Sequence, residues 1–273
     1  MYIIGAVLEK EQTKIALFDQ EYRLLTKKVG ALSNATNLCT DILSEYGIAA
    51  SDVSHIGVAV ESSTPSPLAV AANIEKALGI PCQGTSLIGA RALGEAYLAR
   101  VPSLIVLAIE DTVECGIVIN EQIFAGMHPP DGNVAHMAIN HGGYPCACGR
   151  QGCFEAYVSN SGLKRIAAEA GMTDTDSLTP SLLFGMNTPE AECAKELYVK
   201  YLASGITNII NLFQTNELVL EGPFTEAGDA LMGPMMDIVL REQYSRDLPN
   251  KCNIRFSNKE TDTSLIGAAR LGR

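Results

Sequence analysis

The 273-residue chain carries a net charge of −11, and 47% of its residues are hydrophobic while 19% are charged. The length is sufficient for two modest domains, and the composition is typical of a well-packed globular protein. It disfavours a non-specific nucleic-acid partner, because DNA binding needs clustered Lys and Arg side chains that release counterions. Residues 1–5 lack a basic region followed by an apolar core, and no run of about eighteen apolar residues occurs, so we expect neither a secretory signal nor a membrane span. The eight cysteines are then expected to be reduced cytoplasmic thiols, some of them in a metal site.

Two meanders of short β-strands organise the predicted chain. Apolar, β-rich runs at 2–8 and 13–18 and a third run after Arg23 form the first meander. The patterns that follow it are, in chain order, a helix at 34–47, a strand at 56–60, a helix at 68–78, a strand at 80–83 and a helix at 87–99.

The second meander has predicted strands at 103–109, 114–120 and 122–125. The segments after it are helices at 157–171, 179–184, 189–213 and 226–245, with a strand at 218–220 between the last two. Because each meander is followed by helices and further strands, the sequence predicts an α/β protein that contains an internal duplication.

A cysteine-rich loop gives the strongest functional signal. Cys146, Cys148 and Cys153 form the pattern C-x-C-G-x-x-G-C, and His136 and His141 lie upstream. Thiolates with one imidazole suit a tetrahedral Zn²⁺ site, and four protein ligands leave no coordination position for water, so the expected zinc is structural. Ordinary reduced cysteines or disulfides are the alternative, although Cys146 and Cys148 are too close together for an unstrained bridge. Spacing alone does not decide between the two histidines.

The same loop resembles the zinc loop of the ROK family of repressors, open reading frames and sugar kinases, in which a histidine stands ten residues before C-x-C-G-x-x-G-C-x-E. His136 occupies that position, so the resemblance implies the ligand set His136, Cys146, Cys148 and Cys153. Similar residues also occur at 93–96, Gly126, 220–229 and 264–269.

The resemblance implies the duplicated actin-like ATPase (ribonuclease H-like) fold, in which two lobes enclose a cleft. We expect residues 1–101 plus 259–273 to form the N-terminal lobe. Residues 102–258 would form the C-terminal lobe, which carries the zinc loop at 136–153. Family members are commonly dimers, and a symmetric pair is the usual soluble oligomer, so we also expect a homodimer.

The parts that a kinase of this family needs are altered in this chain. Phosphoryl transfer from ATP needs backbone N–H groups near the phosphates, a metal ion and a base. The family's first glycine-rich hairpin corresponds to residues 6–13, which contain no glycine and have an acidic turn, and the second corresponds to 110–116, which gain three carboxylates. The third glycine cluster corresponds to 221–223, where proline removes an N–H. The proton-accepting aspartate corresponds to Leu87, and losing a general base costs about 10²–10⁴ in rate.

The sugar-binding positions of the family are better preserved. Asn133, His136 and Glu155 correspond to them and could hydrogen-bond vicinal hydroxyl groups. The alternatives are that His136 serves only as a metal ligand and that Glu155 is an exposed residue at the start of a helix.

The sequence therefore predicts a cytoplasmic ROK-like pseudokinase that holds structural Zn²⁺ and does not use Mg²⁺–ATP. We expect it to bind a sugar, a sugar derivative or a protein partner in a sensing or regulatory role, without direct contact to nucleic acid or membrane. The alternative is an active ATP-dependent kinase for glucose or an N-acetyl-hexosamine with rearranged loops, since a fold resemblance does not establish function.

Overall fold

The computed structural model describes residues 1–31, 35–61, 66–126, 133–249, 251–258 and 261–272. The chain forms two compact units. The first unit contains Met1–Val106, Gly116–Gly132 and Asn258–Arg273, and the second contains Leu107–Cys115 and Asn133–Ser257. The lobes expected from the sequence instead assign residues 102–106 and 116–132 to the C-terminal lobe. That division into lobes stays a prediction. Asn34, the expected start of the first helix, lies outside the described residues.

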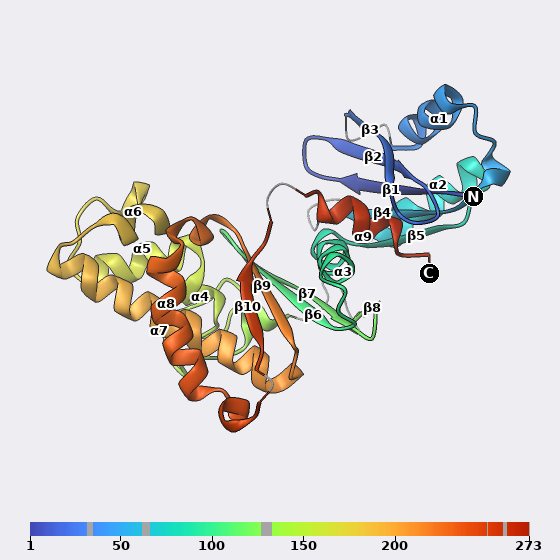
Figure 1. Cartoon of the computed structure of the whole chain (residues 1–273). Helices are drawn as coiled ribbons and strands as arrows, with labels where there is room; N and C mark the ends of the chain where they lie inside the picture. Colours follow the sequence, from blue (N-terminus) through green and yellow to red (C-terminus); the bar gives the residue numbers. More distant parts are fainter. Residues whose placement is uncertain (32–34, 62–65, 127–132, 250, 259–260, 273) are drawn as a thin grey trace. The chain divides into compact units, whose positions relative to one another are not determined.

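The first sheet has the strand order β3-β2-β1-β4-β5 (Figure 1). Its strands are β1 (Tyr2–Leu8), β2 (Thr13–Phe18), β3 (Leu24–Gly30), β4 (Val53–Val60) and β5 (Cys82–Ser86). The pairs β1–β2 and β2–β3 are antiparallel, and β1–β4 and β4–β5 are parallel. The predicted meander is therefore confirmed. The strand predicted at 80–83 lies later in the structure, because Pro81 precedes β5 and contributes only its carbonyl, which accepts the Ile56 N–H.

Both faces of this sheet are buried, which explains why its central strands are almost continuously apolar. The helices of the first unit are α1 (Ala35–Tyr46), η2 (Ala50–Asp52), α2 (Pro67–Leu78), α3 (Leu87–Ala99) and α9 (Thr263–Ala269). Ile4 and Leu8 of β1 pack with residues of α1 and α2, whereas Ile3 and Val7 pack with residues of α3 and α9. Successive side chains of a strand point to opposite faces, so one helix pair covers each face.

Two helices of the first unit approach each other very closely. A Cβ atom on Gly94 of α3 would lie 1.9 Å from the carbonyl oxygen of Thr263, and one on Gly267 of α9 would lie 1.7 Å from that of Ala90. Only glycine permits this backbone contact. The segments 93–96 and 264–269, which the resemblance singled out, therefore form a helix–helix interface.

The second sheet has the order β10-β9-β6-β7-β8 (Figure 1). Its strands are β6 (Leu104–Ile109), β7 (Val113–Ile119), β8 (Gln122–Ile123), β9 (Glu217–Glu221) and β10 (Asn253–Phe256). When β1 to β5 are matched with β6 to β10 in chain order, the second sheet has the strand order of the first, read from the opposite edge. The predicted internal duplication is therefore confirmed. The sequence prediction missed β10, a strand of four residues that pairs in parallel with β9.

Helices make up most of the rest of the second unit. They are η3 (Val134–His136), α4 (Glu155–Val158), α5 (Asn160–Glu169), η4 (Thr175–Ser177), α6 (Pro180–Gly185), α7 (Pro189–Phe213), η5 (Pro223–Ala227), α8 (Asp229–Glu242) and η6 (Tyr244–Asp247). The single helix predicted at 157–171 is wrong, because extended Ser159 interrupts it and caps α5 by accepting the Gly162 N–H. None of the helices in the described ranges combines the length and the apolar run that crossing a membrane requires.

Candidate functional site

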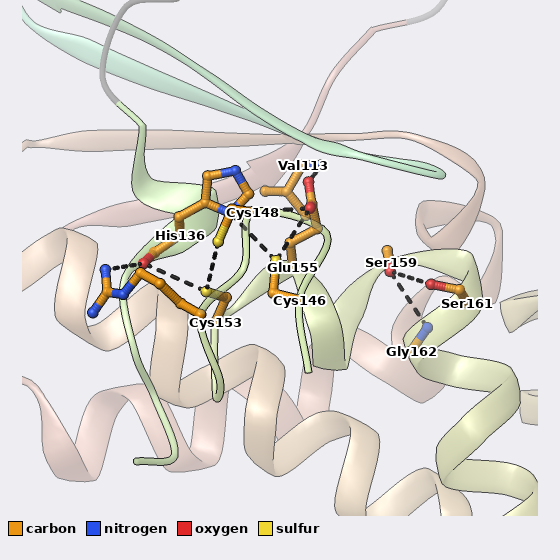
Figure 2. Close-up of polar contacts among 10 residues, drawn as sticks. Val113, His136, Cys146, Cys148, Cys153, Glu155, Ser159, Ser161 and Gly162 are labelled. Atoms are coloured by element: carbon orange, nitrogen blue, oxygen red, sulfur yellow. Dashed lines mark hydrogen bonds and ion pairs between the residues drawn. The ribbon is translucent and has the colours of Figure 1, made fainter. Parts of the chain in front are cut away.

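The four predicted metal ligands lie together in the second unit (Figure 2). One ligand atom from each of His136, Cys146, Cys148 and Cys153 lies within 4.8 Å of all the others. Cys146 Sγ lies 3.5 Å from His136 Nδ1, and Cys148 Sγ lies 3.6 Å from Cys153 Sγ. His141 is exposed and does not belong to this group, so the geometry favours His136 as the fourth ligand.

The two short distances, Cys146–His136 and Cys148–Cys153, match those around one tetrahedral ion. With metal–sulfur bonds of about 2.3 Å and a metal–nitrogen bond of about 2.0–2.1 Å, tetrahedral geometry separates two sulfurs by about 3.8 Å and a sulfur from the nitrogen by about 3.6 Å. The donor set of three thiolates and an imidazole suits a soft or borderline ion such as zinc. With four protein ligands such an ion has no open position, which is the arrangement of a structural site.

The local backbone explains why the cysteine pattern folds this way. Gly149 and Gly152 have φ angles of +86° and +80°, in the left-handed region that favours glycine. The Gly149 N–H donates to the Cys146 carbonyl at 3.0 Å, and the Cys146 N–H donates to the Arg150 carbonyl at 2.9 Å. This tight turn brings two cysteines only two positions apart into the same cluster of possible ligands.

The protonation of the thiols depends on their surroundings. A hydrogen bond from the Arg150 backbone N–H lowers the pKa of Cys148, whereas burial raises the pKa of Cys146 and raises that of Cys153 to about 12. A metal ion binds thiolates and therefore displaces these protons, so metal affinity should fall as the pH is lowered.

A buried tyrosine holds the loop against the helices. Tyr157 is 1% exposed, and its hydroxyl accepts hydrogen bonds from Asn140 Nδ2 at 3.0 Å and from the Tyr144 N–H at 2.9 Å. Its ring stacks on that of Tyr144, with centroids 4.4 Å apart, and lies 4.2 Å from the ring of Tyr201. The sequence prediction missed this support, because nothing in the local pattern marks Tyr157 as the residue that contacts the loop.

Glu155 connects the cysteine loop to the second hairpin. Its Oε2 accepts the Val113 N–H at 3.0 Å, and its Oε1 lies 3.8 Å from Cys146 Sγ and 4.0 Å from His136 Nδ1 (Figure 2). The side chain is 15% exposed, so Glu155 is not the exposed helix-start residue of the alternative interpretation. Its carboxylate can orient a metal-ligating histidine while it fixes the first residue of β7.

The turn of the first hairpin, between β1 and β2, is held by hydrogen bonds and an ion pair within the protein. The Glu9 N–H donates to the Gln12 carbonyl at 2.9 Å, and the Lys10 N–H donates to the carboxylate of Glu61 at 2.7 Å. Lys14 pairs with Glu9 at 2.6 Å. Two backbone N–H groups of the turn are thus already hydrogen-bonded within the protein, and one of them is bonded to an acid.

The second hairpin is also occupied by protein groups. The Glu110 N–H donates to the Thr112 carbonyl at 3.0 Å, and the Asp111 carboxylate accepts a hydrogen bond from Asn160 Nδ2 at 3.0 Å. The Asn160 N–H donates to the Glu110 carbonyl at 2.9 Å. Together with the bond from Val113 to Glu155, these contacts connect the turn to the starts of α4 and α5.

The remaining kinase positions offer little to a nucleotide. Gly222 has a φ angle of +124°, and a Cβ atom there would lie 2.2 Å from the Ile109 carbonyl oxygen, so this glycine is required by chain packing. Pro223, which lacks an N–H, begins η5. Leu87 at the start of α3 is 7% exposed and packs in the hydrophobic cluster of the first unit.

Comparison with known proteins identifies the family. A profile of the ROK family matches residues 34–273. The chain belongs to the ROK family. This ROK chain is 25% identical over 204 residues to a xylose repressor of Bacillus subtilis, an alignment that covers 73% of the chain and 52% of the repressor. It is 30% identical over 200 residues to a glucokinase of Halalkalibacterium halodurans, with 66% of the chain and 60% of the glucokinase covered.

The ROK chain spans about half to three fifths of the length of these two relatives. Its fold matches the crystal structure of a ROK hexokinase from Thermus thermophilus with a TM-score of 0.82 and 21% identity, covering 98% of this chain and 97% of that one. The predicted actin-like, ribonuclease H-like fold is therefore confirmed. The family contains sugar kinases and repressors, so membership alone is compatible with either role.

Proposed function

We propose that this ROK protein binds a sugar or a sugar derivative in a sensing or regulatory role and does not transfer phosphate. The first hairpin carries the proposal. The N–H groups of Glu9 and Lys10 are already bonded inside the protein, and the acceptor for Lys10 is the carboxylate of Glu61. A triphosphate needs free backbone N–H groups, whereas these two are bonded to Gln12 and Glu61.

The position expected for the base supports the same proposal. Leu87 is buried in an apolar cluster and has no group that could accept a proton from a sugar hydroxyl. In the second hairpin the Val113 N–H is bonded to Glu155, so this donor too has a protein acceptor.

Asn133, His136 and Glu155 are the proposed sugar-binding residues. All three belong to the second unit, where Asn133 is exposed and immediately precedes η3, the turn that contains His136. Such a small set of polar groups can recognise vicinal hydroxyls. The similarity to a protein named a xylose repressor supports a sensing role.

His136, Cys146, Cys148 and Cys153 are proposed to bind structural Zn²⁺. The support is that the four ligand atoms all lie within 4.8 Å of one another and that three thiolates with one imidazole suit a tetrahedral ion. His136 is thus proposed both as a metal ligand and as one of the three sugar-binding residues.

The remaining proposals concern the whole protein. We propose a cytoplasmic homodimer in which residues 1–101 plus 259–273 and 102–258 act as the two lobes. A net charge of −11 argues against direct contact of this chain with nucleic acid, so a regulatory role would act through a protein partner or a further segment.

The alternative function, an active glucose or N-acetyl-hexosamine kinase, is favoured by the 30% identity to a glucokinase. A coupled assay of ADP formation separates the two proposals, with Mg²⁺–ATP and a panel of glucose, xylose, N-acetylglucosamine and N-acetylmannosamine. A glucokinase of the family, assayed in parallel, is the positive control. We expect no sugar-dependent ADP formation, and turnover with any of these sugars would establish the alternative.

Sugar binding is tested without nucleotide. We expect at least one sugar of the panel to raise the melting temperature of the protein. The variant Asn133→Ala should lose that shift, whereas Asn216→Ala, a change of an exposed asparagine elsewhere in the second unit, should keep it. A shift that survives Asn133→Ala would remove this residue from the proposed site.

A further inference from the structure

Arg270, at the end of α9, is a buried cation with unsatisfied donors. The residue is only 8% exposed. Within the described part of the chain, neither its Nε nor its Nη1 has a hydrogen-bond partner. Buried donors without acceptors are rare and destabilise a protein, most of all when they are charged, and the described residues supply no acceptor for these two. We infer that Arg270 is the centre of a binding site for a small hydroxylated molecule with an anionic group.

Two tyrosines fix the guanidinium of Arg270. Its Cζ lies 4.9 Å from the ring centroid of Tyr22 and 4.3 Å from that of Tyr97, and the Tyr97 hydroxyl donates to the Glu21 carbonyl at 3.3 Å. Aromatic rings interact with the face of a guanidinium, so the tyrosines satisfy none of its N–H groups. Nε and Nη1 lie buried at its edge, and the side chain as a whole lines the two hollows described next. A guanidinium fixed in this way can bind a carboxylate or a phosphate with little loss of side-chain freedom.

Space for a ligand lies beside these donors. Two adjoining hollows of about 500 and 450 Å³ are both lined by Leu93, Glu121 and Arg270. Arg100, at the end of α3, lines the first hollow. The second hollow is lined further by the carboxamide side chains of Gln83, Asn120 and Gln122. Hollows of this size accommodate small metabolites.

The charges in the hollows define the chemistry of the ligand. Arg270 and Arg100 are the cations among the lining residues, and Glu121 is the carboxylate. The anionic group of the ligand would bind between the arginines, while the Glu121 carboxylate accepts hydrogen bonds from hydroxyl groups and the carboxamides can both accept and donate them. A bare anion would satisfy only the arginines, so the geometry favours an anion that also carries hydroxyls.

This site is independent of the proposed sugar site. All of its residues belong to the first unit, whereas Asn133, Glu155 and the metal ligands belong to the second. Failure of either proposal therefore leaves the other unaffected.

A fluorescence titration tests the inference. The chain contains no tryptophan, so Leu98→Trp, at an exposed leucine that lines the first hollow, gives a unique reporter. The probes are glycerol 3-phosphate and glycerate, which share hydroxyls and differ in the anionic group, with glycerol as the uncharged control at matched ionic strength. Leu212→Trp, at an exposed leucine of the second unit, is the matched control reporter.

We expect saturable fluorescence changes with one or both anions in Leu98→Trp, and none with glycerol or in Leu212→Trp. Adding Arg270→Met, which keeps an unbranched chain beside the two tyrosines, should abolish the response without lowering the melting temperature in anion-free buffer. Arg100 is exposed, and Arg100→Gln should weaken the affinity for the anion at least several-fold. This second variant replaces the first as the test if Arg270→Met fails to fold. The inference is wrong if neither anion gives a saturable response, or if a folded Arg270→Met variant responds as strongly as the parent. If Arg270→Met does not fold, an unchanged response in Arg100→Gln is the result that overturns it.

Discussion

The hydroxyl of Tyr157 can be removed with little change in volume, so Tyr157→Phe tests how the cysteine loop is held. The substitution keeps the ring that stacks on Tyr144 and Tyr201. It leaves the Tyr144 N–H and Asn140 Nδ2 without their acceptor. Water has little room to replace the hydroxyl, because even a Cβ atom on Gly143 would lie 1.9 Å from it.

An unsatisfied buried donor costs about 1–3 kcal/mol, and Asn140 is only partly buried, so we expect Tyr157→Phe to lower the free energy of unfolding by about 2–4 kcal/mol. For a chain of this size the melting temperature should fall by about 5–10 °C. Urea denaturation followed by circular dichroism measures the change, with exposed Tyr244→Phe as the matched control. A loss below about 0.5 kcal/mol, the range of ordinary surface substitutions, would refute the role assigned to the hydroxyl.

Three further predictions concern the metal loop, the helix interface and an ion pair. Cys148→Ser should release most of the proposed zinc and lower stability, because structural zinc contributes about 10–16 kcal/mol in zinc-finger peptides. Elemental analysis measures the zinc content, and Cys193→Ser, at an exposed cysteine, is the control that should retain zinc fully. Full retention in Cys148→Ser would exclude Cys148 as a ligand. Gly94→Ala should cost about 1–3 kcal/mol or more in chemical denaturation, because its Cβ atom would overlap the backbone of α9, and an unchanged midpoint would contradict that packing. Burial raises the pKa of Asp262, but hydrogen bonds, chiefly from Lys27, outweigh burial and lower it. That stability is present above the unfolded pKa of about 3.9 and is lost as the pH falls through the folded pKa, so Asp262→Asn should cost up to about 1 kcal/mol at pH 7. The difference should vanish in unfolding measurements at more acidic pH, and a constant difference would contradict the assignment.

The features that were predicted correctly from the sequence are local ones. Apolar runs define β1 and β2, and the long helix α7 (Pro189–Phe213) was predicted with its observed ends. The cluster of His136 with three cysteines was predictable because Cys146, Cys148 and Cys153 lie within one short segment, whose glycines force the turn. In each case the information lies in neighbouring residues, and tertiary structure does not override it.

The features that were missed depend on residues far apart in the chain. Glu61 accepts a hydrogen bond from Lys10 across 51 positions, and Glu155 accepts one from Val113 across 42. No periodicity or motif records such pairs, because they form only when separate strands and helices pack. Strand β10 was missed for a similar reason: four residues with a mixed pattern become a strand only beside β9.

The central claim is that this ROK protein has no functional site for a nucleoside triphosphate. Calorimetric titration of the zinc-loaded protein with Mg²⁺–ATP tests it most directly. We predict no saturable heat, and no rise in melting temperature at the highest ATP concentration used. Saturable, magnesium-dependent binding would contradict the account, and ATP at a hundredfold excess over its dissociation constant would then add about 2.7 kcal/mol of stability.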